Sequence, residues 1–220
     1  MNICIPLHLS SEKELFKVLK KVKKKAKKYS KIQFIEIGLD ELENQNIKKI
    51  KEAVNPYKAI FAYRKKINFQ KIKNLIEQKA EYLDIDIKNK KIISKLNVQG
   101  HFSKKPKINI IISYHDYQKT PFPEKLEKIA EQCYKLGADI VKIAAMVNEK
   151  KDIETLLVFL KNYRKKYPKR KIIVHGMGKK AKKSRIHAAK GGSYIFYAAL
   201  NEKLKTAKGQ WILEELEHKI

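Results

Sequence analysis

The stretch Ala138-Asp-Ile-Val-Lys-Ile-Ala-Ala-Met146 decides the fold of this chain. Its apolar residues form an almost unbroken run, which is typical of a strand buried on both faces of a parallel sheet. One cation, Lys142, lies in the middle of the run. Burial favours the neutral form of an amine, which is the nucleophilic form. Two hypotheses therefore stay open for Lys142: a Schiff-base lysine, or a structural lysine paired with a carboxylate.

On both sides of this stretch, short apolar strands alternate with amphipathic helices. The pattern predicts helices that begin at a Ser11 cap and near Pro123, and a last helix over 211–218. Residues 88–107 are the least regular part of the chain. Strands are predicted at 3–7, 34–38, 59–63, 82–87, 108–113, 138–146, 171–175 and 193–197.

Repeated strand–helix units imply a parallel sheet. Eight such units in 220 residues, without a break in composition, predict an α/β fold: one (β/α)8 barrel domain over residues 1–220. An open doubly wound sheet is the alternative. It is less favoured because no Gly-rich phosphate loop follows the first strand.

The composition indicates a globular protein, because 43% of the residues are hydrophobic. No apolar run is long enough to span a bilayer, and the first residues lack the pattern of a signal peptide. The two cysteines, Cys4 and Cys133, have no metal-ligand spacing. We therefore expect a cytoplasmic protein with reduced thiols.

The net charge of +28 raises the question of a nucleic-acid partner. Lysines are spread along nearly every predicted helix, and no basic surface interleaved with aromatic residues is visible. A solvated coat of lysines is the favoured interpretation, and nucleic acid is a disfavoured partner. An electric field that attracts anionic metabolites is a third interpretation.

Polar residues recur on or just after the predicted strands. In a (β/α)8 barrel the carboxyl ends of the strands form the active site. Each residue alone has a structural explanation, such as a helix cap or a satisfied histidine. Together they suit a small, oxygen-rich, anionic carbonyl substrate. The residues are Glu36, Arg64, Asp86, His115, Lys142 and Arg185.

Four segments resemble the signature segments of type I 3-dehydroquinate dehydratases. They are 113–121 with the sequence SYHDYQKTP, 138–146, Met177-Gly178 followed by Ser184-Arg185, and 206–210 with the sequence TAKGQ. The resemblance spans nearly the whole chain and implies a TIM barrel. It also implies the dehydration of 3-dehydroquinate to 3-dehydroshikimate in the shikimate pathway, without a metal or diffusible cofactor, and a homodimer.

The same resemblance implies the role of each site residue. Lys142 would form an iminium with the ring ketone, and His115 would take a proton from the neighbouring carbon and protonate the departing hydroxyl. Arg185 and Gln210 would hold the substrate carboxylate. The remaining substrate-binding residues are Glu36 and Arg64, at the ring hydroxyls, and Thr206.

Four positions depart from the pattern of the family. Gly38 stands where the family usually has an arginine, and Asn68 stands where it has a glutamate near the catalytic histidine. Lys208 replaces a proline, and Ala181 replaces a glycine. A divergent barrel with weak or altered activity and a basic nucleic-acid-binding protein are therefore the alternatives.

Overall fold

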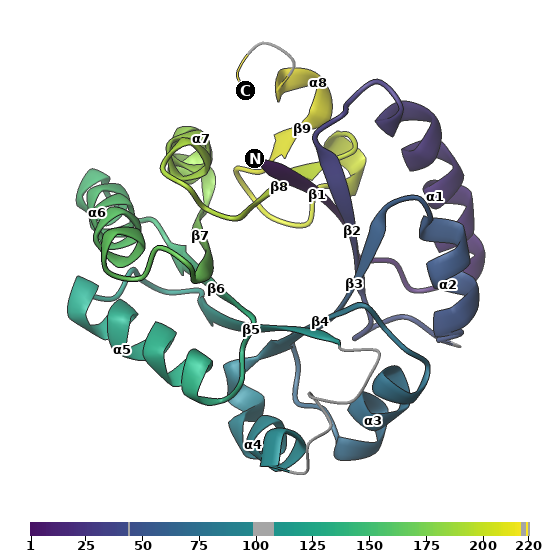
Figure 1. The fold of residues 1–220 in the computed structure, drawn as a ribbon. Helices are drawn as coiled ribbons and strands as arrows, with labels where there is room; N and C mark the ends of the chain where they lie inside the picture. The colour runs from purple at the N-terminus through teal and green to yellow at the C-terminus, as the bar shows by residue number, and fades with distance from the viewer. Residues whose placement is uncertain (44, 99–107, 217–218, 220) are drawn as a thin grey trace.

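The structure is a computed structural model, and it describes residues 1–43, 45–98, 108–216 and 219. Its strands join one curved parallel sheet, which Figure 1 shows from one end. The order in the sheet is β7-β6-β5-β4-β3-β2-β1-β8-β9. The strands are β1 (Asn2–Leu7), β2 (Ile32–Gly38), β3 (Lys58–Tyr63), β4 (Tyr82–Asp86), β5 (Asn109–Asp116), β6 (Ile140–Met146), β7 (Lys171–Met177), β8 (Ile195–Ala199) and β9 (Trp211–Ile212).

The seam of the barrel lies between β7 and β8. In the described part of the chain no ladder of paired residues joins these two strands. Two hydrogen bonds connect them instead: Tyr194 N–H donates to Ile172 O at 2.8 Å, and Val174 N–H donates to Ser193 Oγ at 3.0 Å. The strand order and the helical ring around it confirm the predicted (β/α)8 barrel.

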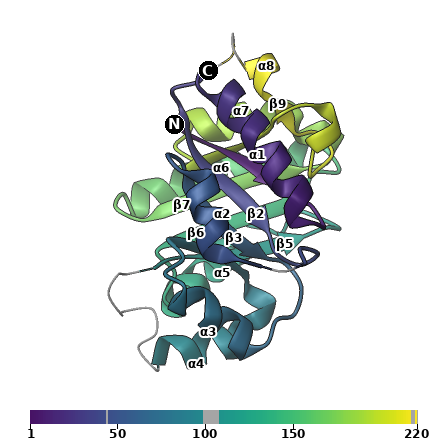
Figure 2. The same cartoon turned by 90° about the vertical axis from the view of Figure 1, so that its right-hand side faces the viewer.

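Helices surround the sheet on its outer side (Figures 1 and 2). Among the described residues, none of them combines the length and the apolarity that crossing a bilayer requires. The longer helices are α1 (Glu12–Ala26), α2 (Ile47–Val54), α3 (Phe69–Glu77), α4 (Lys90–Val98), α5 (Pro123–Lys135), α6 (Lys150–Lys166) and α7 (Lys182–Lys190). The shorter ones are η1 (Ile87–Asn89), η3 (Lys179–Ala181), η4 (Glu202–Leu204) and α8 (Leu213–Leu216).

Local signals set several helix ends as predicted. Ser11 Oγ accepts a hydrogen bond from Glu14 N–H at 3.3 Å at the start of α1, and α5 begins at Pro123. Proline suits the first turn because the first N–H groups of a helix have no partner inside it. Gly137, which follows α5, has a φ of 96° that favours glycine.

Three elements differ from the sequence prediction. Residues 90–98 form α4, although the segment was expected to be irregular. Its buried side includes Ile93 and Leu96, too few apolar residues to show a helical period in the sequence. Residues 99–107 lie outside the described residues. β8 lies at 195–199 and not at 193–197. The predicted last helix starts instead with β9, which pairs with Ala198 and Ala199, and residues 217–218 lie outside the described residues.

Alternate residues of each strand point to opposite sides of the sheet. In β6, Val141 and Ile143 pack in the layer between sheet and helices, whereas Ile140 belongs to a separate apolar cluster inside the barrel. The two-residue period therefore places Lys142 and Ala144 on the inner side, above Ile140. The inner cluster is Cys4, Phe34, Ile60, Tyr82, Ile111, Ile140, Ile173, Ile195 and Tyr197.

Candidate active site

A cavity of about 620 Å³ lies where the carboxyl ends of the strands meet. This is the end of the barrel at which active sites form. The structure places all seven predicted site residues on the wall of this cavity, although placement does not decide their roles. They are Glu36, Arg64, His115, Lys142, Arg185, Thr206 and Gln210.

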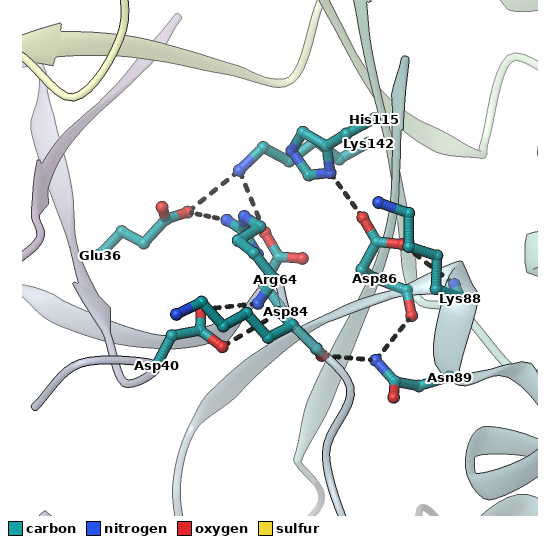
Figure 3. Close-up of polar contacts among 10 residues, drawn as sticks. Glu36, Asp40, Arg64, Asp84, Asp86, Lys88, Asn89, His115 and Lys142 are labelled. Atoms are coloured by element: carbon teal, nitrogen blue, oxygen red, sulfur yellow. Dashed lines mark hydrogen bonds and ion pairs between the residues drawn. The ribbon is translucent and has the colours of Figure 1, made fainter. Parts of the chain in front are cut away.

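Lys142 belongs to a cluster of four charged side chains, in which Lys142, Glu36 and Asp84 are buried and Arg64 is partly buried (Figure 3). Its Nζ lies 3.1 Å from Glu36 Oε2 and 3.1 Å from Asp84 Oδ2. One guanidinium nitrogen of Arg64 lies 3.0 Å and 2.8 Å from the same two oxygens. Two cations thus face two carboxylates, so the cluster is electrically balanced. Balance matters here because an unpaired buried charge costs several kcal/mol, roughly 3–5 when one partner is removed.

The cluster controls the protonation of its carboxylates. Burial opposes ionisation of Glu36, but Lys142 and Arg64 outweigh it and hold the pKa of Glu36 well below its usual range. The same balance, with Arg64 the stronger cation, lowers the pKa of Asp84. An ammonium must lose a proton before it can attack a carbonyl. That proton has to leave the cluster, because carboxylates with lowered pKa values are poor bases. Glu36 and Asp84 hold the amine in position instead, each at 3.1 Å.

Sequence reasoning missed Asp84 as a partner of Lys142. The sequence does contain a signal for Asp84, which is the alternation of side chains along β4. Asp84 and Asp86 lie on either side of Ile85, so both carboxylates point to the same, inner side of the sheet. The pairing of Asp84 itself could not be predicted, because it depends on the distance across the barrel between β4 and β6.

Asp40 positions the arginine of the cluster. Its carboxylate accepts hydrogen bonds from Arg64 N–H at 2.8 Å and from Lys65 N–H at 3.0 Å. These bonds hold the segment after β3 in a fixed conformation, so that the guanidinium of Arg64 turns inward (Figure 3). Asp40 therefore supports the site through the backbone.

His115 on β5 has a carboxylate partner. Its Nδ1 lies 2.8 Å from Asp86 Oδ2, as Figure 3 shows, and both side chains are buried. The carboxylate fixes the tautomer with hydrogen on Nδ1, which leaves Nε2 as the base. Burial lowers the pKa of His115, and the hydrogen bond to Asp86 works in the opposite direction. The imidazole is therefore neutral near pH 7 and able to accept a proton.

Asn68 does not take part in this pairing. Its Oδ1 accepts a hydrogen bond from Lys71 N–H at 2.9 Å and so caps α3. The carboxylate that the family resemblance places at position 68 is thus supplied beside His115 by Asp86, from β4. The departure at Asn68 does not leave the histidine without a charged partner.

Arg185 is a buried cation without a carboxylate partner among the residues that the structure describes. It is 5% exposed, and its Nε donates to Gly176 O at 3.0 Å. Burial lowers the pKa of Arg185 to about 10. A desolvated guanidinium on a cavity wall is suited to bind a carboxylate in a bidentate manner.

The closing segment brings Gln210 to the same cavity. The Oε1 of Gln210 accepts hydrogen bonds from Thr206 N–H at 2.9 Å and from Thr206 Oγ at 3.3 Å. Because that oxygen is engaged, the amide nitrogen is the group that can donate to a substrate. Gly209 makes the approach possible: it has a φ of 75°, and a Cβ there would lie 2.2 Å from Gly178 O.

A histidine fills the space beside Gly38. A Cβ at Gly38 would lie 2.6 Å from Cδ2 of His8, and His8 Nε2 lies 3.4 Å from Glu36 Oε1. Both His8 and Gly38 line the cavity. The missing arginine side chain at position 38 is therefore replaced in space by an imidazole from the end of β1.

Fold and cavity together place the chain among (β/α)8-barrel enzymes. The particular family follows from comparison with known proteins. The model of the Type I 3-dehydroquinase family matches residues 3–219, and the chain belongs to this family. Its enzymes are dehydratases, that is, carbon–oxygen lyases of the shikimate pathway.

Individual relatives agree with this assignment. The 3-dehydroquinate dehydratase of Thermodesulfovibrio yellowstonii is 46% identical over 114 residues, which cover 52% of this chain and only 48% of that protein. That of Methanococcus maripaludis is 30% identical over 226 residues, covering 98% of this chain and 96% of the relative. A crystal structure of the type I enzyme of Clostridium difficile is similar with a TM-score of 0.80 and 25% identity, covering 98% of this chain and 88% of that one.

Proposed function

We propose that this chain dehydrates 3-dehydroquinate to 3-dehydroshikimate through an imine on Lys142. The observation that supports this most strongly is the position of Lys142. Its amine lies at the cavity wall, within 3.1 Å of two ionised carboxylates. On the neighbouring strand, His115 pairs with Ala144, the next inward residue after Lys142. The site therefore combines a nucleophile, carboxylates that hold it in position and a neutral base.

The reaction begins when the amine of Lys142 attacks the ring ketone and water leaves. The resulting iminium withdraws electrons from the adjacent carbon, whose proton moves to Nε2 of His115. The electron pair of that C–H bond forms the new double bond as the hydroxyl leaves and takes the proton from His115. Hydrolysis of the imine then frees the amine, and the net change is the loss of one water.

The charged cluster fits the positive intermediate. An iminium on Lys142 keeps the positive charge that Glu36 and Asp84 already face, so the cluster stays balanced through the reaction. Arg185, Gln210 and Thr206 would hold the carboxylate.

In this proposal Glu36 and Arg64 also face the ring hydroxyls. The side chain of Arg64 is 16% exposed and that of Glu36 3%, so Arg64 is the more accessible of the two.

Borohydride trapping tests the proposal. Reduction during turnover of 3-dehydroquinate should add the mass of the reduced ligand to the intact protein, at the peptide that contains Lys142. Lys142→Ala should gain no mass. The proposal fails if the wild-type protein gains none, or if the variant gains as much.

A further inference from the structure

His175 on β7 is a buried histidine with no role in the mechanism above. It is 7% exposed and lines the cavity. Neither ring nitrogen has a hydrogen-bond partner among the described residues. Buried polar groups are nearly always paired, because leaving one unpaired forfeits its hydration without replacement. A cavity-facing imidazole without a protein partner is therefore suited to a partner that arrives with the substrate.

The strand register places His175 beside the nucleophile. His115 pairs with Ala144 across β5 and β6, and Ala144 pairs with His175 across β6 and β7. Ala144 is the next inward residue after Lys142. The two histidines therefore lie in one row, one on each side of β6, immediately above Lys142.

The two histidines differ in what surrounds them. Asp86 engages Nδ1 of His115, whereas His175 packs against the ring of Tyr197, edge to face, at a centroid distance of 5.1 Å. The same ring lies 4.1 Å from Nζ of Lys142. Tyr197 thus orients His175 by packing next to the amine but leaves its ring nitrogens free.

The charge state of His175 indicates which contact it can make. Burial lowers its pKa well below the usual range, and the positive charges of Arg185 and Lys142 act in the same direction. The ring is neutral near pH 7, with one N–H donor and one acceptor nitrogen. The geometry places it between the nucleophile and the proposed carboxylate anchor. His175 pairs with Ala144, two residues after Lys142. Arg185 Nε donates to the carbonyl of Gly176, the residue after His175.

We propose that His175 contacts the substrate directly and donates a ring N–H to an oxygen of the substrate carboxylate. The carbon that carries this carboxylate also loses the hydroxyl, so the contact orients the half of the molecule on which water is eliminated. The proposal rests on the dehydratase function proposed above. It adds a specificity-determining residue on β7 to those that the family resemblance implies.

Two variants separate a hydrogen bond from packing. His175→Leu removes both ring nitrogens, and we expect kcat/KM for 3-dehydroquinate to fall about 10- to 100-fold, the loss of a hydrogen bond to a charged group. His175→Gln keeps a donor and should retain most of the activity. Borohydride should still trap both variants on Lys142. The exposed His187 on α7, changed to Gln, is the matched control and should behave as wild type.

Unchanged kcat/KM in His175→Leu overturns the proposal, and so does an equal loss in His175→Leu and His175→Gln, which would indicate packing alone. If the leucine variant does not fold, nitrogen-15 spectra of the wild-type histidines give the answer. The ring resonances of His175 are assigned as those that are lost in His175→Gln. Saturating 3-dehydroshikimate should shift these resonances in the wild-type protein. If they do not shift, the proposed contact is wrong. Wild-type turnover is read separately: its absence would reject the dehydratase function itself.

Discussion

Replacing Asp86 with asparagine tests whether the carboxylate beside His115 supports proton transfer. The two groups lie 2.8 Å apart, and their side chains are 1% and 7% exposed. A buried hydrogen bond to a charged group contributes about 1.5–3 kcal/mol. If the imidazolium that forms during the reaction loses this stabilisation, kcat should fall about 10- to 150-fold.

The dependence of kcat/KM on pH gives a second readout. Burial lowers the pKa of His115, and the hydrogen bond that its ring donates to Asp86 raises it. Without the carboxylate the pKa should fall further, because the largest raising contribution is lost while burial, Arg64 and Lys142 still lower it. Since protonated His115 cannot act as a base, the acid limb of the profile should move to lower pH while the plateau falls. The borohydride adduct on Lys142 should form as in wild type.

Asn68→Ala is the matched control, because Asn68 occupies the position of the family glutamate. It caps α3, so its loss should lower the free energy of unfolding by about 1 kcal/mol and leave kcat unchanged. Urea titration and steady-state kinetics measure the two quantities. Wild-type kcat in Asp86→Asn, or an equal loss of kcat in Asn68→Ala, would show that Asp86 is not the partner that matters.

Three further experiments test other parts of the molecule. Arg185→Met should raise KM about 10- to 150-fold, because the substrate carboxylate loses its proposed cation. The melting temperature should be equal or higher, because the change removes a buried cation without a carboxylate partner among the described residues. Gly38→Ala should displace the ring of His8 and therefore have the same effect as His8→Ala. Each variant should lower the free energy of unfolding by about 0.5–1.5 kcal/mol. A double variant that is less stable than either single variant would contradict this. Burial raises the pKa of Cys4 and raises that of Cys133 to about 12, so a disulfide reagent should label neither thiol in the native protein and both in urea.

The barrel could be predicted because its strands have a simple pattern. The apolar run at 138–146 needs burial on both faces, and repetition of strand and helix leaves few arrangements of a parallel sheet. The prediction was weakest where few apolar residues mark an element. In α4, Ile93 and Leu96 are buried among exposed lysines, and β9 is too short to show any period.

The partners within the site could not be predicted in the same way. The sequence indicates that Asp84 and Asp86 share one side of β4, but not which strand each one faces. Asp84 meets Lys142 and Asp86 meets His115. The register pairs Asp86 with Ser113 and Ser113 with Lys142, so even the register would not have given these contacts. Family resemblance was also no guide here, since it directs attention to Asn68. The roles of the seven predicted site residues stay predictions until the variants are measured.

The two hypotheses for Lys142 are compatible in this structure. A lysine paired with carboxylates was the structural hypothesis, and the pairs with Glu36 and Asp84 exist. Both carboxylates stay ionised, because Lys142 and Arg64 lower their pKa values. After attack they face an iminium of the same charge, so the pairing that stabilises the fold is kept in the intermediate. A structural lysine would need only the pairing, whereas this one also lies on the cavity wall, in reach of a ligand, with a neutral histidine on the next strand.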